Sequence, residues 1–217
     1  MDNLNLLLQL HTPQELQYYS NLAHWSIGFL FIVIALLALL EATGKLKPKF
    51  NYIRPTILFL SGLFLPLGFA HHIGSQFNLA LQATWLIPDQ RQHAIMAILL
   101  MIAGLAELLS VRYYKNSKVL RLVFPIVFIT IGLLFLFHPQ HGNAADMMRV
   151  VAIHEYLGIA FILVGVFEAF AELFKIKQLT IAWIILMLVT GGLLLTYREA
   201  DMSYLSNPQM FQEHINH

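Results

Sequence analysis

The chain has 217 residues, of which 58% are hydrophobic and only 12% are charged, and its mean hydropathy is +0.67. Soluble globular domains carry about 25% charged residues, so this composition indicates an integral membrane protein in contact with a lipid bilayer. The net charge of +1 and the lack of a basic tract give no reason to expect nucleic-acid binding. The chain has no cysteine, which excludes disulfides, thiolate zinc sites and iron–sulfur clusters.

The N-terminal region gives two local signals. Thr12-Pro13-Gln14-Glu15 is a capping-box pattern with proline at the first helical position. It predicts that the first helix begins well before its apolar part. The short apolar run that precedes this pattern has no basic region before it, so we expect no cleavable signal peptide.

Six apolar stretches are each near the length of about 20 residues that crosses a hydrocarbon core. They predict an all-α, polytopic membrane protein with six transmembrane helices in one antiparallel bundle. The tails, residues 1–20 and 200–217, are expected to lie outside the membrane. The predicted spans cover residues 21–43, 55–75, 93–112, 120–141, 151–173 and 179–199.

The spans show a pattern of three degenerate helical hairpins. His24, His93 and His154 open the odd spans, and a glycine lies midway along each even span: Gly62, Gly132 and Gly192. The alternative is that similar helix lengths imitate a repeat. Both readings stay open on the sequence.

Two segments between or after spans add local predictions. Residues 77–86 are apolar but too short to cross, which predicts an interfacial or re-entrant helix. At the end of the sixth span, Arg198 and Glu199 are expected either to pair with each other or to bind an anionic group.

Positive charges are concentrated at one end of the predicted spans. Ten of the 13 Lys and Arg residues lie in the first, third and fifth loops between spans. The positive-inside rule assigns these loops to the cytoplasm. Both termini are then extracytoplasmic, in an inner or plasma membrane. Glutamates near the basic end are expected to pair with these loops rather than to form a proton or cation path: Glu41, Glu107, Glu168 and Glu172.

Histidines gather at the opposite end of the spans. Imidazole is the commonest protein metal ligand, and ionisable residues at membrane depth indicate functional sites. Independent interfacial histidines have no reason to choose one side, so we expect a cluster that binds a transition metal. The candidate metal ligands are His24, His71, His72, His93, His138, His141 and His154, with Glu155 as a ligand or a partner of one.

The ligand types narrow the metal but leave the function open. Imidazole and carboxylate suit copper, iron or zinc. Copper is favoured by four methionines near the histidines: Met147, Met148, Met202 and Met210. A glycine one turn after His24 and after His154 leaves room for a flat ligand, so haem b is the alternative. Three functions remain: metal binding for handling or assembly, an oxidoreductase that uses haem or metal on a quinol or lipid, and a metal-free accessory protein of other membrane subunits.

Overall fold

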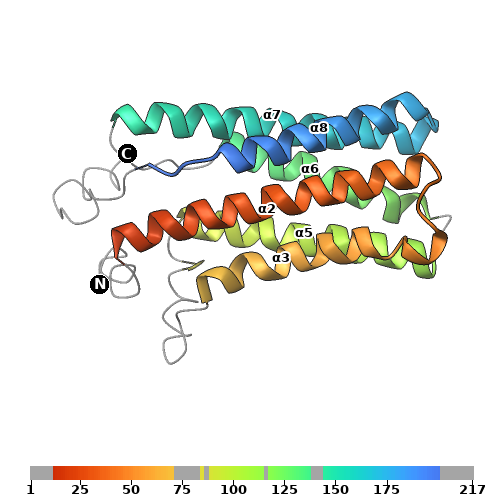
Figure 1. Cartoon of the computed structure of the whole chain (residues 1–217), viewed down its shortest axis with the longest axis horizontal. Coiled ribbons are helices and arrows are strands. Elements are labelled where there is room, and N and C mark those ends of the chain that lie inside the picture. Colours follow the sequence, from red (N-terminus) through yellow and green to blue (C-terminus); the bar gives the residue numbers. More distant parts are fainter. Residues whose placement is uncertain (1–11, 71–83, 86–87, 115–116, 138–143, 201–217) are drawn as a thin grey trace.

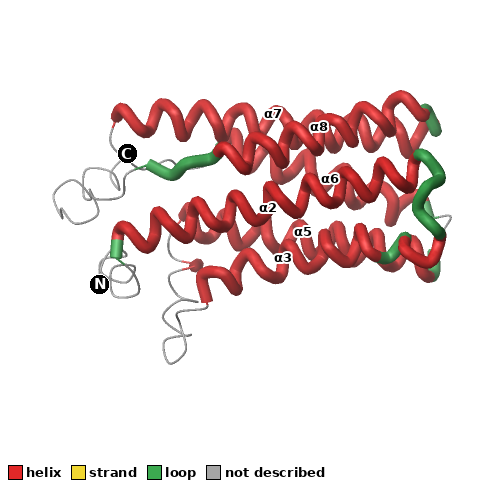
Figure 2. Tube along the Cα trace, in the orientation of Figure 1, coloured by secondary structure: helices red, strands yellow, loops and turns green. Residues whose placement is uncertain are grey.

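The computed structural model describes residues 12–70, 84–85, 88–114, 117–137 and 144–200. Every regular element within these ranges is a helix, as predicted, and the helices lie along one common axis (Figure 1). The described loops gather at the two ends of the bundle (Figure 2). The elements are α2 (Pro13–Ala42), the short 3-10 helix η1 (Pro48–Phe50), α3 (Ile53–Ala70), α5 (Pro88–Arg112), α6 (Lys118–Leu136), α7 (Ala144–Phe174) and α8 (Lys177–Thr196).

Five helices of the described chain are long and apolar enough to cross a membrane. Their qualifying segments are Gln14–Ala42, Gln90–Arg112, Lys118–Leu136, Met148–Phe174 and Lys177–Thr196. The predicted span 55–75 falls on α3, which is not among the five, and its residues 71–75 lie outside the described chain. A sixth span therefore stays a prediction. The predicted helix at 77–86 also lies almost wholly outside the described residues.

The ends of the first and last helices follow from identifiable contacts. Thr12 accepts the Glu15 backbone N–H while the Glu15 carboxylate accepts the Thr12 N–H, so the predicted capping box is confirmed. The predicted span 179–199 is too long, because α8 ends at Thr196 and the chain continues as an extended segment to Ala200. Tyr197 leaves the helix because its side chain is buried against α2, where the Trp25 indole N–H donates to its carbonyl at 2.8 Å.

The helices described in the structure form a closed ring. Each packs against its neighbours in the chain, from α2 through α3, α5, α6 and α7 to α8, and α8 then packs against α2. The described chain begins and ends at the same end of the ring, as an antiparallel order requires (Figure 1). We call this the histidine end, because it holds His24, His93 and His154, and the other the glutamate end.

Three helix pairs within this ring approach one another closely at small residues. A Cβ added to Gly191 in α8 would lie 2.8 Å from the carbonyl oxygen of Gly28 in α2. A Cβ added to Gly62 would likewise meet the Ala97 carbonyl oxygen, and one added to Gly132 would lie 2.6 Å from the Gly158 oxygen. Without a hydrophobic effect between lipid-immersed helices, such backbone approach is a main source of their association.

In the third predicted hairpin, the glycine at the close helix contact is Gly191. The sequence pattern had favoured its neighbour Gly192. A Cβ built on Gly192 meets nothing within 4 Å. The two adjacent positions differ because successive residues of a helix point about 100° apart, so only one of them faces α2.

These neighbouring glycines provide a matched pair of substitutions. We expect Gly191→Ala to lower the free energy of unfolding by about 1–3 kcal/mol, because α2 and α8 must separate to admit the methyl group. Gly192→Ala should be neutral or stabilising by up to about 1 kcal/mol, since it restricts the unfolded chain without a clash. Thermal or denaturant unfolding in detergent, followed by circular dichroism, measures both. Equal effects would contradict the close α2–α8 contact.

Candidate functional site

Three of the predicted ligands lie together at the histidine end. His24 of α2 has its ring centroid 5.9 Å from that of His93 in α5 and 6.1 Å from that of His154 in α7. These residues open the predicted spans, and each lies between about one and three turns inside its helix. His24 and His154 are 7% and 3% exposed, so imidazoles from three helices meet in the interior of the ring.

Backbone carbonyls fix the orientation of two of these rings. Nδ1 of His24 lies 2.7 Å from the Ser20 oxygen, and Nδ1 of His154 lies 2.8 Å from the Val150 oxygen. A carbonyl oxygen only accepts hydrogen bonds, so Nδ1 carries the proton in both rings and Nε2 carries the lone pair. This is the arrangement in which metal-binding histidines are held by their second nitrogen.

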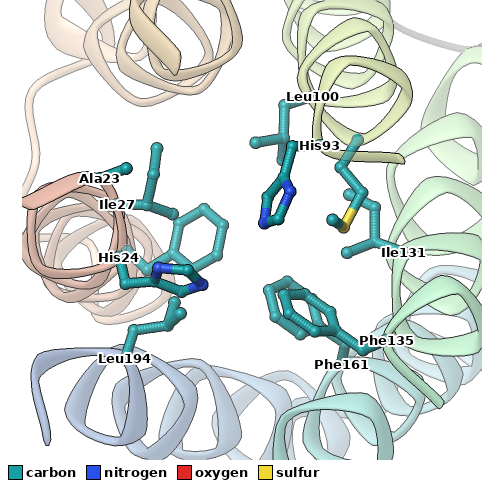
Figure 3. Close-up of a pocket in the computed structure, with 11 residues that line it drawn as sticks. Ala23, His24, Ile27, His93, Leu100, Ile131, Phe135, Phe161 and Leu194 are labelled. Carbon is teal, nitrogen blue, oxygen red and sulfur yellow. The ribbon is translucent and has the colours of Figure 1, made fainter. Parts of the chain in front are cut away.

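An apolar pocket opens between the histidines. Figure 3 shows His24 and His93 pointing into it from two sides, with the rings of Phe135 and Phe161 on a third. The cavity has a volume of about 50 Å³ and is partly open to the outside. The remaining lining residues are Ala23, Ile27, Phe31, Met96, Leu100, Ile131 and Leu194.

The pocket floor repeats a spacing that is visible in the sequence. A large apolar residue follows each histidine by seven positions, and these are Phe31, Leu100 and Phe161, all of which line the pocket. A small residue follows each histidine by four positions, at the close helix contacts: Gly28, Ala97 and Gly158. Residues at i, i+4 and i+7 share one helix face, so aligning the three histidine helices would have identified the floor.

Tyr197 is a further member of the site that is absent from the predicted ligands. Its ring stacks on that of His24 with a centroid distance of 3.7 Å and lies 5.4 Å from that of His154. Burial, and then the adjacent Glu199 carboxylate, raise the pKa of the Tyr197 phenol well above its ordinary value. The hydroxyl therefore stays protonated and donates to Glu199 at 2.8 Å.

Glu199 fastens the extended segment after α8 onto α2. Its carboxylate accepts from Ser20 Oγ at 2.6 Å, and its backbone N–H donates to Asn21 Oδ1 at 2.6 Å. Gln17 donates to its carbonyl oxygen at 3.2 Å. In the described structure Glu199 thus bonds to α2 and Tyr197 rather than to Arg198, contrary to the predicted Arg198–Glu199 pair.

Glu155, another predicted ligand, is not part of this cluster. Glu155 is exposed on α7 and does not line the pocket, since it points away from its buried neighbour His154. Among the residues that the structure describes, no group of three or more His, Asp or Glu side chains is arranged to hold a metal ion. Four predicted ligands lie outside the described residues: His71, His72, His138 and His141.

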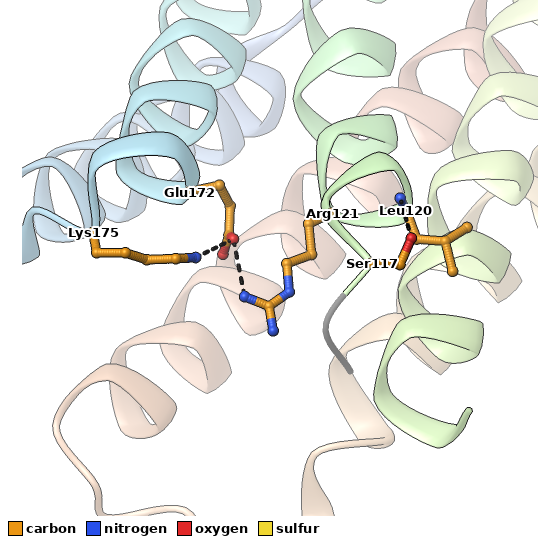
Figure 4. Close-up of polar contacts among 5 residues, drawn as sticks. All are labelled: Ser117, Leu120, Arg121, Glu172 and Lys175. Atoms are coloured by element: carbon orange, nitrogen blue, oxygen red, sulfur yellow. Dashed lines mark hydrogen bonds and ion pairs between the residues drawn. The ribbon is translucent and has the colours of Figure 1, made fainter. Parts of the chain in front are cut away.

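At the glutamate end, three of the four glutamates make the predicted salt bridges. Arg54 contacts Glu41 at 2.8 Å and Glu107 at 2.9 Å. Glu172 contacts Lys175 at 2.6 Å and Arg121 at 3.4 Å, next to the helix cap that Ser117 provides for α6 (Figure 4). The four glutamates are therefore spatially separate from the histidines.

Comparison with known protein families, with curated proteins and with solved structures finds no match to this chain.

The bonds around Glu199 predict a difference between two adjacent substitutions. Glu199→Ala leaves the buried Tyr197 hydroxyl and the Ser20 hydroxyl without this acceptor, so we expect the free energy of unfolding to fall by about 1–3 kcal/mol. Arg198→Ala, at an exposed position, should change it by no more than about 0.5 kcal/mol. Unfolding in detergent measures both variants. A larger effect at Arg198 would contradict the anchoring role of Glu199.

Proposed function

We propose that this protein is an integral membrane protein that binds a transition metal through a histidine cluster at the extracytoplasmic ends of its helices. The observation that carries the proposal is the meeting of His24, His93 and His154 from three helices, with His24 and His93 lining one apolar pocket. Ionisable side chains at membrane depth are costly and mark functional sites. A single histidine at a helix end is explained by contact with water at the membrane interface, whereas this does not explain why three histidines from different helices converge.

The spacing of the rings suits a shared ion. Two imidazoles bound to one metal at N–metal distances of about 2.0–2.1 Å have ring centroids roughly 5 to 6.5 Å apart. The His24–His93 and His24–His154 distances of 5.9 and 6.1 Å fall in this range. Further ligands are proposed from the histidines that directly follow α3 and α6 in sequence, His71, His72, His138 and His141.

The proposal places the site outside the cytoplasm because of the charge distribution. The basic residues that join α2 to α3 and α7 to α8 belong to the glutamate end, and the positive-inside rule assigns that end to the cytoplasm. Copper is the favoured metal, with iron or zinc as alternatives, on the ligand types and the nearby methionines. The fold also carries the three-hairpin repeat, supported by the shared spacing of histidine, small residue and apolar residue in α2, α5 and α7.

The test is metal analysis of the purified protein and of histidine variants. We expect His24→Ala and His154→Ala to reduce affinity for copper at least about tenfold, the equivalent of roughly 1.4 kcal/mol, measured by competition with a chelating dye. His11→Ala and His217→Ala, in the predicted tails, serve as controls and should change it little. Circular dichroism confirms that the variants fold. If the purified protein contains no metal and has no measurable affinity for copper, iron or zinc, the proposal is wrong and the function as an accessory membrane subunit remains.

Metal binding should weaken in acid. Protons compete with the metal for imidazole nitrogen, so retention should fall as the pH drops below about 6. Equilibrium dialysis of the loaded protein across a pH series measures this. Metal retained unchanged at about pH 4.5 would argue for ligands other than histidine.

A second candidate is an oxidoreductase with a haem b held by two histidines. The observation that favours it is the apolar pocket with aromatic walls into which His24 and His93 point from different helices (Figure 3). The optical spectrum of the purified protein separates the candidates. A visible haem spectrum that disappears in both His24→Ala and His93→Ala supports this function and a quinol or lipid as its reaction partner. Bound copper without a haem spectrum supports the first.

A further inference from the structure

The pocket that His24 and His93 line has a hydrocarbon floor. Apart from the two imidazoles, the side chains that line it within the described chain contain no nitrogen or oxygen. The floor residues Phe31, Leu100 and Phe161 follow the histidines of their helices by seven positions, which is two turns further into the bundle. Each of the three is at most 2% exposed. The pocket therefore joins a possible pair of metal ligands to a deeply buried apolar surface (Figure 3).

Aromatic contacts hold the floor in place. The ring of Phe161 has its centroid 5.6 Å from that of Phe31, 5.5 Å from that of Phe128 and 5.3 Å from that of Phe135. Aromatic pairs are attractive at centroid distances of about 4.5–7 Å. Phe161 cannot rotate into the cavity without giving up these contacts. The cavity is therefore a fixed feature of the packing between the helices.

The size and the lining of the cavity limit what can bind at its floor. A cavity of about 150 Å³ lined by leucine, isoleucine and phenylalanine stays dry and binds benzene or xenon. This cavity has a volume of about 50 Å³, which leaves room for a molecule of about two or three non-hydrogen atoms. A buried water needs about two to four polar partners, which a hydrocarbon floor does not offer, and an ion there would lose its hydration without compensation. The floor therefore suits a small, uncharged, apolar molecule.

We propose that this floor binds one small apolar molecule, of the class to which dioxygen belongs, next to a metal ion held by the histidines. The inference rests on the proposed metal site and extends it by naming the class of molecule that shares the cavity with the ion. His24 and His93 line the same small cavity as the floor residues, so an ion on these imidazoles and a molecule on the floor would lie close together. Nδ1 of His24 is occupied by the Ser20 carbonyl, which leaves Nε2 as the nitrogen that can bind the ion.

Xenon tests the floor without any metal, because it is an apolar probe of such cavities. In crystals of the whole, metal-free protein under xenon pressure, we expect an anomalous-scattering peak between Phe31, Leu100 and Phe161. Leu100→Trp fills the floor and should abolish this peak. Leu105→Trp is the matched control on the same helix, at a residue that is 48% exposed, and should retain it. A wild-type protein without the peak, or a peak that survives Leu100→Trp, overturns the proposal.

Carbon monoxide, a small apolar ligand of Cu(I), separates this inference from the metal site itself. In wild-type protein loaded with Cu(I), we expect an infrared stretching band of copper-bound carbon monoxide, which Leu100→Trp should abolish and Leu105→Trp should leave unchanged. Bound copper without this band overturns the inference and leaves the metal site. Xenon at the floor of a protein with no measurable copper affinity overturns the metal site and supports the floor as a binding site on its own. The wild-type measurements decide the matter even if Leu100→Trp fails to fold.

Discussion

The close approach of helix backbones at glycine is the constraint on which the remaining structure depends. Gly28 and Gly191 bring α2 against α8, and this contact closes the ring that the chain-neighbour contacts leave open. A side chain larger than hydrogen at either position would push the two helices apart. The pocket exists only because the ring is closed, since His24 and Leu194 reach it from the two helices that meet at this seam.

Within the ring, apolar and polar side chains lie at different levels along the helix axes. Aromatic contacts among Phe31, Phe128 and Phe161, with centroids 5.5–5.8 Å apart, form an apolar core. His24 and His93 lie on the histidine side of this core and the Arg54 cluster lies on the other. Specific partners hold the main groups of both clusters: backbone carbonyls orient His24 and His154, while Arg54 links two glutamates from different helices. Both clusters are therefore built by the convergence of helices rather than by any single segment.

Local features of the sequence predicted much of this arrangement. The helices, the Thr12 capping box and the Glu172–Lys175 pair depend on residues close together in the chain, and all are confirmed. Tyr197 could not be placed in the same way, because its stacking on His24 requires α8 to lie beside α2. These helices are far apart in sequence: the hydrogen bond from Trp25 to Tyr197 joins residues 172 positions apart. The choice between Gly191 and Gly192 had the same origin, since only the rotation of α8 in the ring decides it. The end of α8 was misjudged because no glycine or proline directly follows Thr196 in the sequence, whereas the Glu199 bonds to α2 hold the chain outside the helix.

The position of the seam orders the assembly of the protein during its synthesis. The ribosome produces α2 first among the described helices and α8 after the other five, so the two helices that close the ring are the most distant in time. Until α8 enters the bilayer, the groove of α2 that carries His24 lacks the Tyr197 ring and the Gly191 backbone that cover it. The pocket is therefore completed only after α8 has been translated and has packed against α2.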